Sequence, residues 1–425
     1  MALSITTLPE NAGLLDLPWH VPLERWPADQ LVALPRGISR HVVRFVRLDG
    51  VVYAVKEVGQ RLAEREFRLL RDLARLDLPA VEAVAVVAGR ETPQGEPLDP
   101  ALITRHLQFS LPYRALFSRT LRPDTAKRLL DALTVLLVRL HLAGFASNDC
   151  SLSNTLFRRD AGAYAAYLVD AETGDLHPQL SRGQRASDLD VARVNIAGEL
   201  FDLQAGGFLH PSVDPIAISA YLVQGYEGLW DEITRPQEIP PGEHYQVDAR
   251  LRRLNDLGFD VAELEMVREP GRPTLIVKPK VVDAGHHSRR LMRLTGLDVE
   301  ENQARRLLND LDTFRAATER QQDDEEIVAN DWLMLVFEPL VEAVPRELRG
   351  KLEPAQIFHE VLEHRWFLSE AAGHDVGLDA ALDSYISTVL VHKPDEKAIL
   401  GTKVTDALEY DPLEDTAEMR LVFPD

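Results

Sequence analysis

The 425-residue sequence contains a single cysteine, Cys150, so no disulfide bond can form within the chain. It also lacks an apolar run of about 18 residues, the shortest stretch that spans a bilayer as a helix. Even the leucine-rich stretch 129–142 is interrupted by Asp131 and Arg139. The 47 lysines and arginines are outnumbered by 68 acidic residues, which gives a net charge of −21. These deficits exclude a disulfide-stabilised scaffold and argue against broad binding to nucleic acid or anionic membranes, which depends on clustered Lys and Arg.

The N-terminal residues do not have the charge order of a secretory signal. Glu10 and Asp16 precede Arg25, the first lysine or arginine, whereas a signal peptide begins with positive charge. A lone cysteine also suits a reducing compartment. We therefore expect a cytoplasmic protein.

The length predicts more than one domain, because a single hydrophobic core rarely serves 425 residues. The Pro- and Gly-rich stretch 235–242 is typical of a linker and suggests a boundary. We accordingly expect one domain over 1–234 and a second over 243–400. Residues 401–425 carry seven acidic and two basic side chains, which predicts a loosely ordered acidic tail.

Hydrophobic periodicity predicts a mixture of strands and helices, an α+β class. Short apolar runs predict strands at 42–46, 51–55, 81–88 and 102–105, and Asp49-Gly50 favours a hairpin turn between the first two. Helical periodicity follows at 64–74 and from Pro123 onward, where leucines recur to residue 140. In the second half we expect a strand at 274–277 and helices at 247–257, 288–295, 300–315, 333–344 and 355–371.

Polar residues at the ends of these elements fall in the order that phosphoryl transfer from ATP requires. Lys56 ends the strand-like run 51–56, and Asp170 ends the apolar run 167–169. Between them, Asp149 is followed five residues later by Asn154, the spacing of a kinase catalytic loop. A lysine neutralises phosphate charge, an aspartate orients the acceptor hydroxyl, and Asn and Asp oxygens are ligands that Mg²⁺ prefers.

The lysine needs a carboxylate partner on the following helix, and two glutamates compete for this place. Glu66 is followed at offsets of four and seven by Leu70 and Leu73, so it shares the helix face that packs inward. Glu64 points to a different side of the helix. We favour Glu66.

Residues from about 30 to 230 resemble a protein-kinase-like domain, closest to the bacterial lipopolysaccharide kinase family, which phosphorylates core sugars. The resemblance implies a two-lobed domain that uses ATP and Mg²⁺. It implies that Lys56 is the strand lysine with Glu66 as its partner, that Asp149 is the catalytic aspartate, and that Asn154 and Asp170 are metal ligands. The second half resembles an uncharacterised, mostly helical α/β domain that follows such kinase-like domains in bacteria.

Three positions depart from the kinase pattern. The phosphate-covering loop 34–41 has one glycine, so contacts to phosphate would come from Gly37, Ser39 and Arg40. Ser147 stands where a histidine is usual, and 171–172 reads Ala-Glu where many kinases have Phe-Gly. Thr104 lies on the strand that would lead to the adenine-binding hinge.

Three functions remain open at the level of the sequence. The first is an enzyme that transfers phosphate from ATP to a hydroxyl of a sugar, glycolipid or other small acceptor. The second is a pseudokinase that binds nucleotide and regulates a partner, because a fold does not fix a function. The third is an assembly protein in which the second domain docks to a protein partner.

Other polar residues have competing interpretations. Either Asp188 or Asp190 would anchor the catalytic loop, unless both cap a helix. Cys150 is either a reactive thiol beside Asp149 or a packed small residue. The basic group 286–293 either binds an anion or pairs with nearby carboxylates. His359 and His364 are five residues apart, a spacing that argues against a metal site on a helix.

Overall fold

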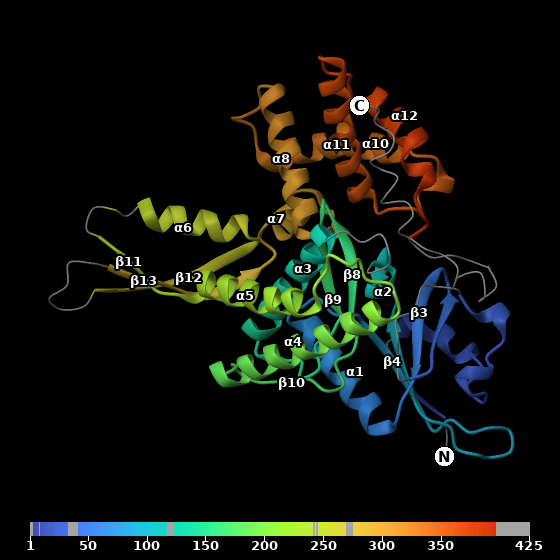
Figure 1. Cartoon of the computed structure of the whole chain (residues 1–425). Coiled ribbons are helices and arrows are strands. Elements are labelled where there is room, and N and C mark those ends of the chain that lie inside the picture. The colour runs from blue at the N-terminus through green and yellow to red at the C-terminus, as the bar shows by residue number, and fades with distance from the viewer. Residues whose placement is uncertain are drawn as a thin grey trace.

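The computed structural model describes residues 3–7, 9–32, 41–116, 123–240, 243, 245–268 and 275–396 (Figure 1). The first lobe is a five-stranded antiparallel sheet with the strand order β1-β4-β5-β3-β2. Its strands are β1 (Ser4–Thr7), β2 (Val43–Leu48), β3 (Val51–Glu57), β4 (Ala83–Ala88) and β5 (Ala101–Arg105). Asp49 and Gly50 join β2 to β3 with φ angles of 50° and 82°, which confirms the expected hairpin.

Strand alternation in β3 separates the packing residues from the functional lysine. Tyr53 and Val55 are buried against the N-terminal segment of the chain, where Trp19 and Trp26 belong to the same apolar cluster. Lys56 therefore points to the opposite face of the sheet. Three 3₁₀ helices supply the covering layer, η1 (Pro9–Asp16), η2 (Leu23–Arg25) and η3 (Ala28–Gln30).

Helix α1 (Gln60–Arg75) follows β3 and packs its apolar stripe against the sheet and the second lobe. Its buried residues include Glu66, Leu70 and Leu73, at the offsets of four and seven that the sequence predicts. A buried carboxylate within an apolar stripe requires a partner, because burial of an unpaired charge is costly.

The second lobe is built around one long buried helix, α3 (Pro123–Leu142). Its leucines form a common core with residues of the neighbouring helices and strands. Gly144 lies just after α3 and has a φ of 85°. An added Cβ would lie 2.0 Å from the carbonyl oxygen of His177, so this turn requires glycine. The remaining elements of the lobe are α2 (Tyr113–Leu116), α4 (Arg182–Ala205), α5 (Pro215–Thr234), β6 (Ser110–Pro112), β7 (Phe145–Ala146), β8 (Thr155–Asp160), β9 (Ala163–Leu168) and β10 (Asp175–Leu176).

A three-stranded antiparallel sheet follows, with the order β11-β13-β12. It consists of β11 (Gln237–Ile239), β12 (Phe259–Arg268) and β13 (Leu275–Ala284), with α6 (Tyr245–Asp256) against β12, and Figure 1 shows it extending to one side. Part of the expected linker 235–242 is therefore an ordered strand. The apolar residues Leu254 and Phe259 join the core of the second lobe, so the chain stays packed beyond this point. The division into domains at 235–242 remains a prediction.

The C-terminal part is a helical layer with a separate core around Trp332, Phe358 and Tyr385. Its helices are α7 (His286–Thr295), α8 (Glu301–Ala317), α9 (Glu325–Trp332), the π-helical η4 (Leu333–Phe337), α10 (Glu338–Ala343), α11 (Pro354–Ala372) and α12 (Leu378–Thr388), with 3₁₀ turns η5 (Arg346–Leu348) and η6 (Leu390–His392). The expected helices are confirmed, whereas β12, α9 and α12 were not predicted. The expected α+β class, with a two-lobed kinase-like part and a mostly helical C-terminal part, is confirmed.

Strand β8 holds the C-terminal helices against the second lobe. The buried carboxylate of Asp160 accepts hydrogen bonds from the backbone N–H groups of Asn302 and Gln303, at 3.2 and 2.7 Å, and so satisfies the start of α8. Arg159 forms an ion pair of 2.9 Å with Glu396. No helix among the described residues is both long and apolar enough to cross a membrane.

Candidate active site

A cavity of about 950 Å³ lies between the five-stranded sheet and the second lobe. Its wall includes five of the residues singled out from the sequence, namely Lys56, Thr104, Asp149, Asn154 and Asp170. Residues 102–112 and helix α4 supply further parts of the wall, and Asp395 and Glu396 reach it from the C-terminal part. The cavity is large enough for a nucleotide-sized ligand, since small-molecule sites usually measure about 300–1,000 Å³.

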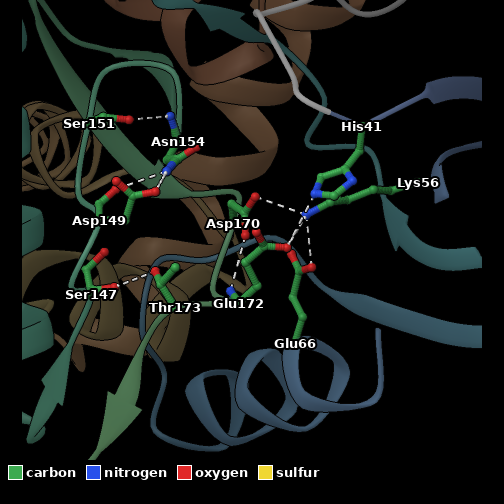
Figure 2. Close-up of polar contacts among 10 residues, drawn as sticks. All are labelled: His41, Lys56, Glu66, Ser147, Asp149, Ser151, Asn154, Asp170, Glu172 and Thr173. Carbon is green, nitrogen blue, oxygen red and sulfur yellow. Dashed lines mark hydrogen bonds and ion pairs between the residues drawn. The ribbon is translucent and has the colours of Figure 1, made fainter. Parts of the chain in front are cut away.

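Three carboxylates surround the ammonium group of Lys56 (Figure 2). The Nζ atom lies 3.0 Å from Glu66, 2.9 Å from Asp170 and 3.3 Å from Glu172. Glu64, the alternative partner, is exposed and accepts a hydrogen bond from Gln60. The structure therefore places Glu66, and not Glu64, against the lysine.

Burial and crowding determine the ionisation of this group. Burial raises the pKa of Glu66 to about 7, and repulsion by Asp170 acts in the same direction while Lys56 opposes it. Burial alone would lower the pKa of Lys56, but the carboxylates, with Glu66 first, raise it above its ordinary value. The lysine is thus held as a cation at neutral pH.

The segment after β9 brings Asp170 to the cavity and connects it to the loop that carries Asp149. The backbone N–H of Glu172 donates to Asp170 Oδ1 at 3.1 Å, which fixes the carboxylate. At the next residue, the hydroxyl of Thr173 donates to the carbonyl of Ser147 at 2.8 Å. The two polar segments are therefore positioned relative to each other by direct contacts (Figure 2).

Asp149 and Asn154 lie on one loop between β7 and β8. The Asn154 amide Nδ2 donates to the carbonyl oxygen of Asp149 at 2.9 Å and lies 3.4 Å from its carboxylate Oδ2. Because both partners are acceptors, the amide nitrogen must face them, and the amide oxygen is the atom of Asn154 that suits a cation. This closes the loop into a compact turn at the cavity wall.

Asp188 anchors the start of the same loop from below. It is buried, and it accepts hydrogen bonds from the backbone N–H groups of Ser147 and Asn148 at 2.8 and 2.7 Å. His141 Nε2 lies 2.9 Å from the same carboxylate. The N-cap of α4 is Ser181, so the capping interpretation of Asp188 was wrong.

The kinase-like geometry agrees with the comparison to known families. Residues 47–197 match the family model described as lipopolysaccharide kinase (Kdo/WaaP) family. Residues 228–390 match a second model, described as domain of unknown function (DUF4032). These matches confirm the resemblance inferred from the sequence and support a phosphotransferase of the kinase class for the first part of the chain.

A solved structure titled "WaaP in complex with acyl carrier protein" also aligns with the chain. It is 17% identical, with a TM-score of 0.34, and the alignment covers 60% of this chain and 99% of that chain. No curated protein matches.

The sequence did not reveal two residues that contact the candidate site. Glu172 was noted only as a departure from Phe-Gly, yet it contacts Lys56 directly. Asn195 on α4 contacts Asp149, and no local motif marks it. The expected phosphate contacts Gly37, Ser39 and Arg40 lie outside the described residues.

The other polar clusters are occupied by internal contacts. His286 and Arg289 both pair with Asp260, and His287 pairs with Glu301. The structure therefore favours intramolecular pairing in this group, as opposed to an open anion site. His364 contacts Ser384.

Cys150 is buried, and burial raises the pKa of its thiol well above the ordinary value, with Asp188 and Glu199 adding to the effect. This supports the packed residue over the reactive thiol.

Proposed function

We propose that this protein is an ATP- and Mg²⁺-dependent phosphotransferase that acts on a hydroxyl group of a sugar, glycolipid or other small acceptor. The observation that carries the proposal is the assembly of Lys56, Asp149, Asn154 and Asp170 on the wall of one cavity. These residues come from three separate parts of the chain. The match to a lipopolysaccharide kinase family over residues 47–197 supports the acceptor class.

In this proposal Lys56 provides fixed positive charge for the phosphates of ATP. Its ion pair with buried Glu66 restricts the ammonium to the cavity side of β3, so little entropy is lost when a phosphate replaces a carboxylate. A preorganised cation stabilises the charge that develops during transfer more effectively than a mobile one.

The donor set fits Mg²⁺. Asp170 supplies a carboxylate and Asn154 an amide oxygen, both hard oxygen donors on the cavity wall. When bound, the ion neutralises phosphate charge. We assign Mg²⁺ binding to these two side chains.

Asp149 orients the acceptor hydroxyl and receives its proton. The loop contacts to Asn154 and Asn195 hold the carboxylate in place, so it meets the positional requirement for a general base. Thr104 on β5 borders the same cavity and is assigned to the nucleotide side.

The decisive experiment compares ATP turnover of the wild type with Asp149→Asn in the presence of Mg²⁺. We expect turnover to fall by about 10²–10⁴-fold, the usual contribution of general acid–base catalysis, with ATP affinity changed by less than about threefold. Asp190→Asn, an exposed position on α4 paired with Arg193, is the matched control and should retain turnover. Equal turnover in the wild type and Asp149→Asn would reject the enzyme and leave a nucleotide-binding pseudokinase or scaffold.

A further inference from the structure

One face of α4 contacts the catalytic loop at three successive places. Asp188 accepts the backbone N–H groups of residues 147 and 148, Asn195 contacts residues 149 and 150, and Glu199 accepts those of residues 152 and 153. The three residues are separated by seven and four positions, so they lie within about 40° of one another around the helix axis. The helix therefore follows the loop along its whole length.

Asn195 is the member of this row that touches the reactive carboxylate. Its Nδ2 donates to Asp149 Oδ1 at 3.0 Å and lies 3.3 Å from the carbonyl oxygen of Cys150. Both partners are acceptors only, so the amide nitrogen must face them. The opposite orientation would place the amide oxygen against two other oxygens.

We infer that Asn195 is a positioning residue for Asp149, which fixes the direction of its carboxylate within the cavity. The inference rests on the proposed function. Asn195 holds Oδ1 from the α4 side, while Asn154 approaches Oδ2 from within the loop at 3.4 Å. A carboxylate that is held at both oxygens cannot rotate freely. The direction from which the acceptor hydroxyl can approach it is therefore fixed.

A neutral donor is the appropriate side chain at this position. An amide donates to the carboxylate without adding charge to the site. Aspartate at 195 has almost the same shape, but would place a second carboxylate about 3 Å from Asp149. An ionised carboxylate cannot donate, and like charges at this distance repel each other, so the contact that holds Oδ1 would be lost.

The experiment measures kcat and KM of Mg²⁺-dependent ATP turnover for the wild type, Asn195→Asp and Asn195→Ala. In both variants we expect kcat to fall at least about tenfold while KM for ATP stays within about twofold. Gln204→Glu adds a carboxylate to an exposed position of the same helix and should keep both constants.

The outcomes separate the two hypotheses. A wild type without turnover would reject the proposed function. An active wild type would overturn the inference if Asn195→Ala or Asn195→Asp kept its kcat. A merely structural Asn195 would lower the melting temperature of both variants and leave kcat per folded protein unchanged, which would also overturn the inference.

Discussion

Lys56 and Glu66 form a 3.0 Å ion pair in which the carboxylate side chain is 2% exposed and the lysine side chain 13% exposed. Because Asp170 and Glu172 share the same ammonium, three acids face one base around this pair. The three carboxylates together carry more negative charge than the single ammonium can neutralise. Under the proposed function, Asp170 is the carboxylate that would turn to Mg²⁺ while Glu66 keeps the lysine in place.

The first prediction concerns nucleotide binding. Lys56→Ala and Asp170→Asn should each weaken or abolish stabilisation by Mg·ATP, because the first removes the phosphate contact and the second removes a metal ligand. For the wild type, ATP at 100 times its Kd should stabilise by about 2.7 kcal/mol. Thermal shift measurements with ATP, with and without Mg²⁺, provide the test.

The control is Arg68→Ala, which removes an exposed cation from α1 and should keep the full shift. If ATP stabilised the wild type and both site variants equally, the roles assigned to Lys56 and Asp170 would be wrong.

The second prediction concerns pH. The pKa of Glu66 is raised from its ordinary value of 4.5 to about 7, so the stability associated with this group is present below pH 4.5 and is lost as pH rises through 7. Glu66→Gln removes this loss. Its free energy of unfolding, relative to the wild type, should increase by on the order of 1–3 kcal/mol from pH 5 to pH 8.

Urea unfolding at several pH values measures this difference without nucleotide. Glu64→Gln is the matched control, since Glu64 lies on the same helix but is exposed, and its difference from the wild type should stay flat. A flat profile for Glu66→Gln as well would show that Glu66 titrates normally. The same variant should reduce Mg·ATP binding, because the lysine loses an anionic partner.

The fold of the kinase-like part followed from local patterns. The Asp49-Gly50 turn, the periodicity of α1 and the leucine series of α3 each depend on residues close in sequence, and each was predicted near its observed place. The choice of Glu66 over Glu64 also followed from helix periodicity alone. Strand β12 was missed although its apolar and charged residues alternate and Pro270 and Gly271 are turn signals, and it pairs with the next strand, β13, from Arg268–Leu275 to Phe259–Ala284.

The parts of the site that depend on tertiary contacts could not be predicted. Asn195 lies 46 residues from Asp149 in the sequence, and only the packing of α4 below the catalytic loop brings them together. The approach of Asp395 to the cavity depends on the docking of the C-terminal helices onto β8. Such contacts are set by packing between elements, for which a single sequence has no local signal.

The third prediction concerns Cys150. Its thiol is buried and its pKa is raised by burial, so the reactive thiolate is scarce at neutral pH. In the native protein it should react with a thiol reagent at least about 100-fold more slowly than in urea-unfolded protein. Mass spectrometry of alkylated samples measures both rates, and modification at the unfolded rate under native conditions would show an accessible, activated thiol.

The last prediction concerns the contact between β8 and the segment after η6. Glu396 is buried against Arg159, with Nη2 to Oε1 at 2.9 Å, and its backbone N–H bonds to the carbonyl of Lys351. Glu396→Ala should destabilise the protein by about 3–5 kcal/mol, because it leaves the Arg159 guanidinium buried without its partner. The exposed pair of Asp190 and Arg193 supplies the control, since Asp190→Ala should cost about 0.5 kcal/mol or less.

A double variant distinguishes loss of the charge pair from simple loss of packing. Arg159→Met combined with Glu396→Met removes both charges and fills much of the volume, so it should be more stable than Glu396→Ala alone. Urea midpoints followed by circular dichroism measure all four proteins. If Glu396→Ala matched the exposed control, the ion pair would contribute no more than a surface contact, and other contacts of β8, such as those of Asp160 with the start of α8, would have to hold the C-terminal helices in place. A large cost in Glu396→Ala that the double variant partly restores would instead assign the docking to this buried pair.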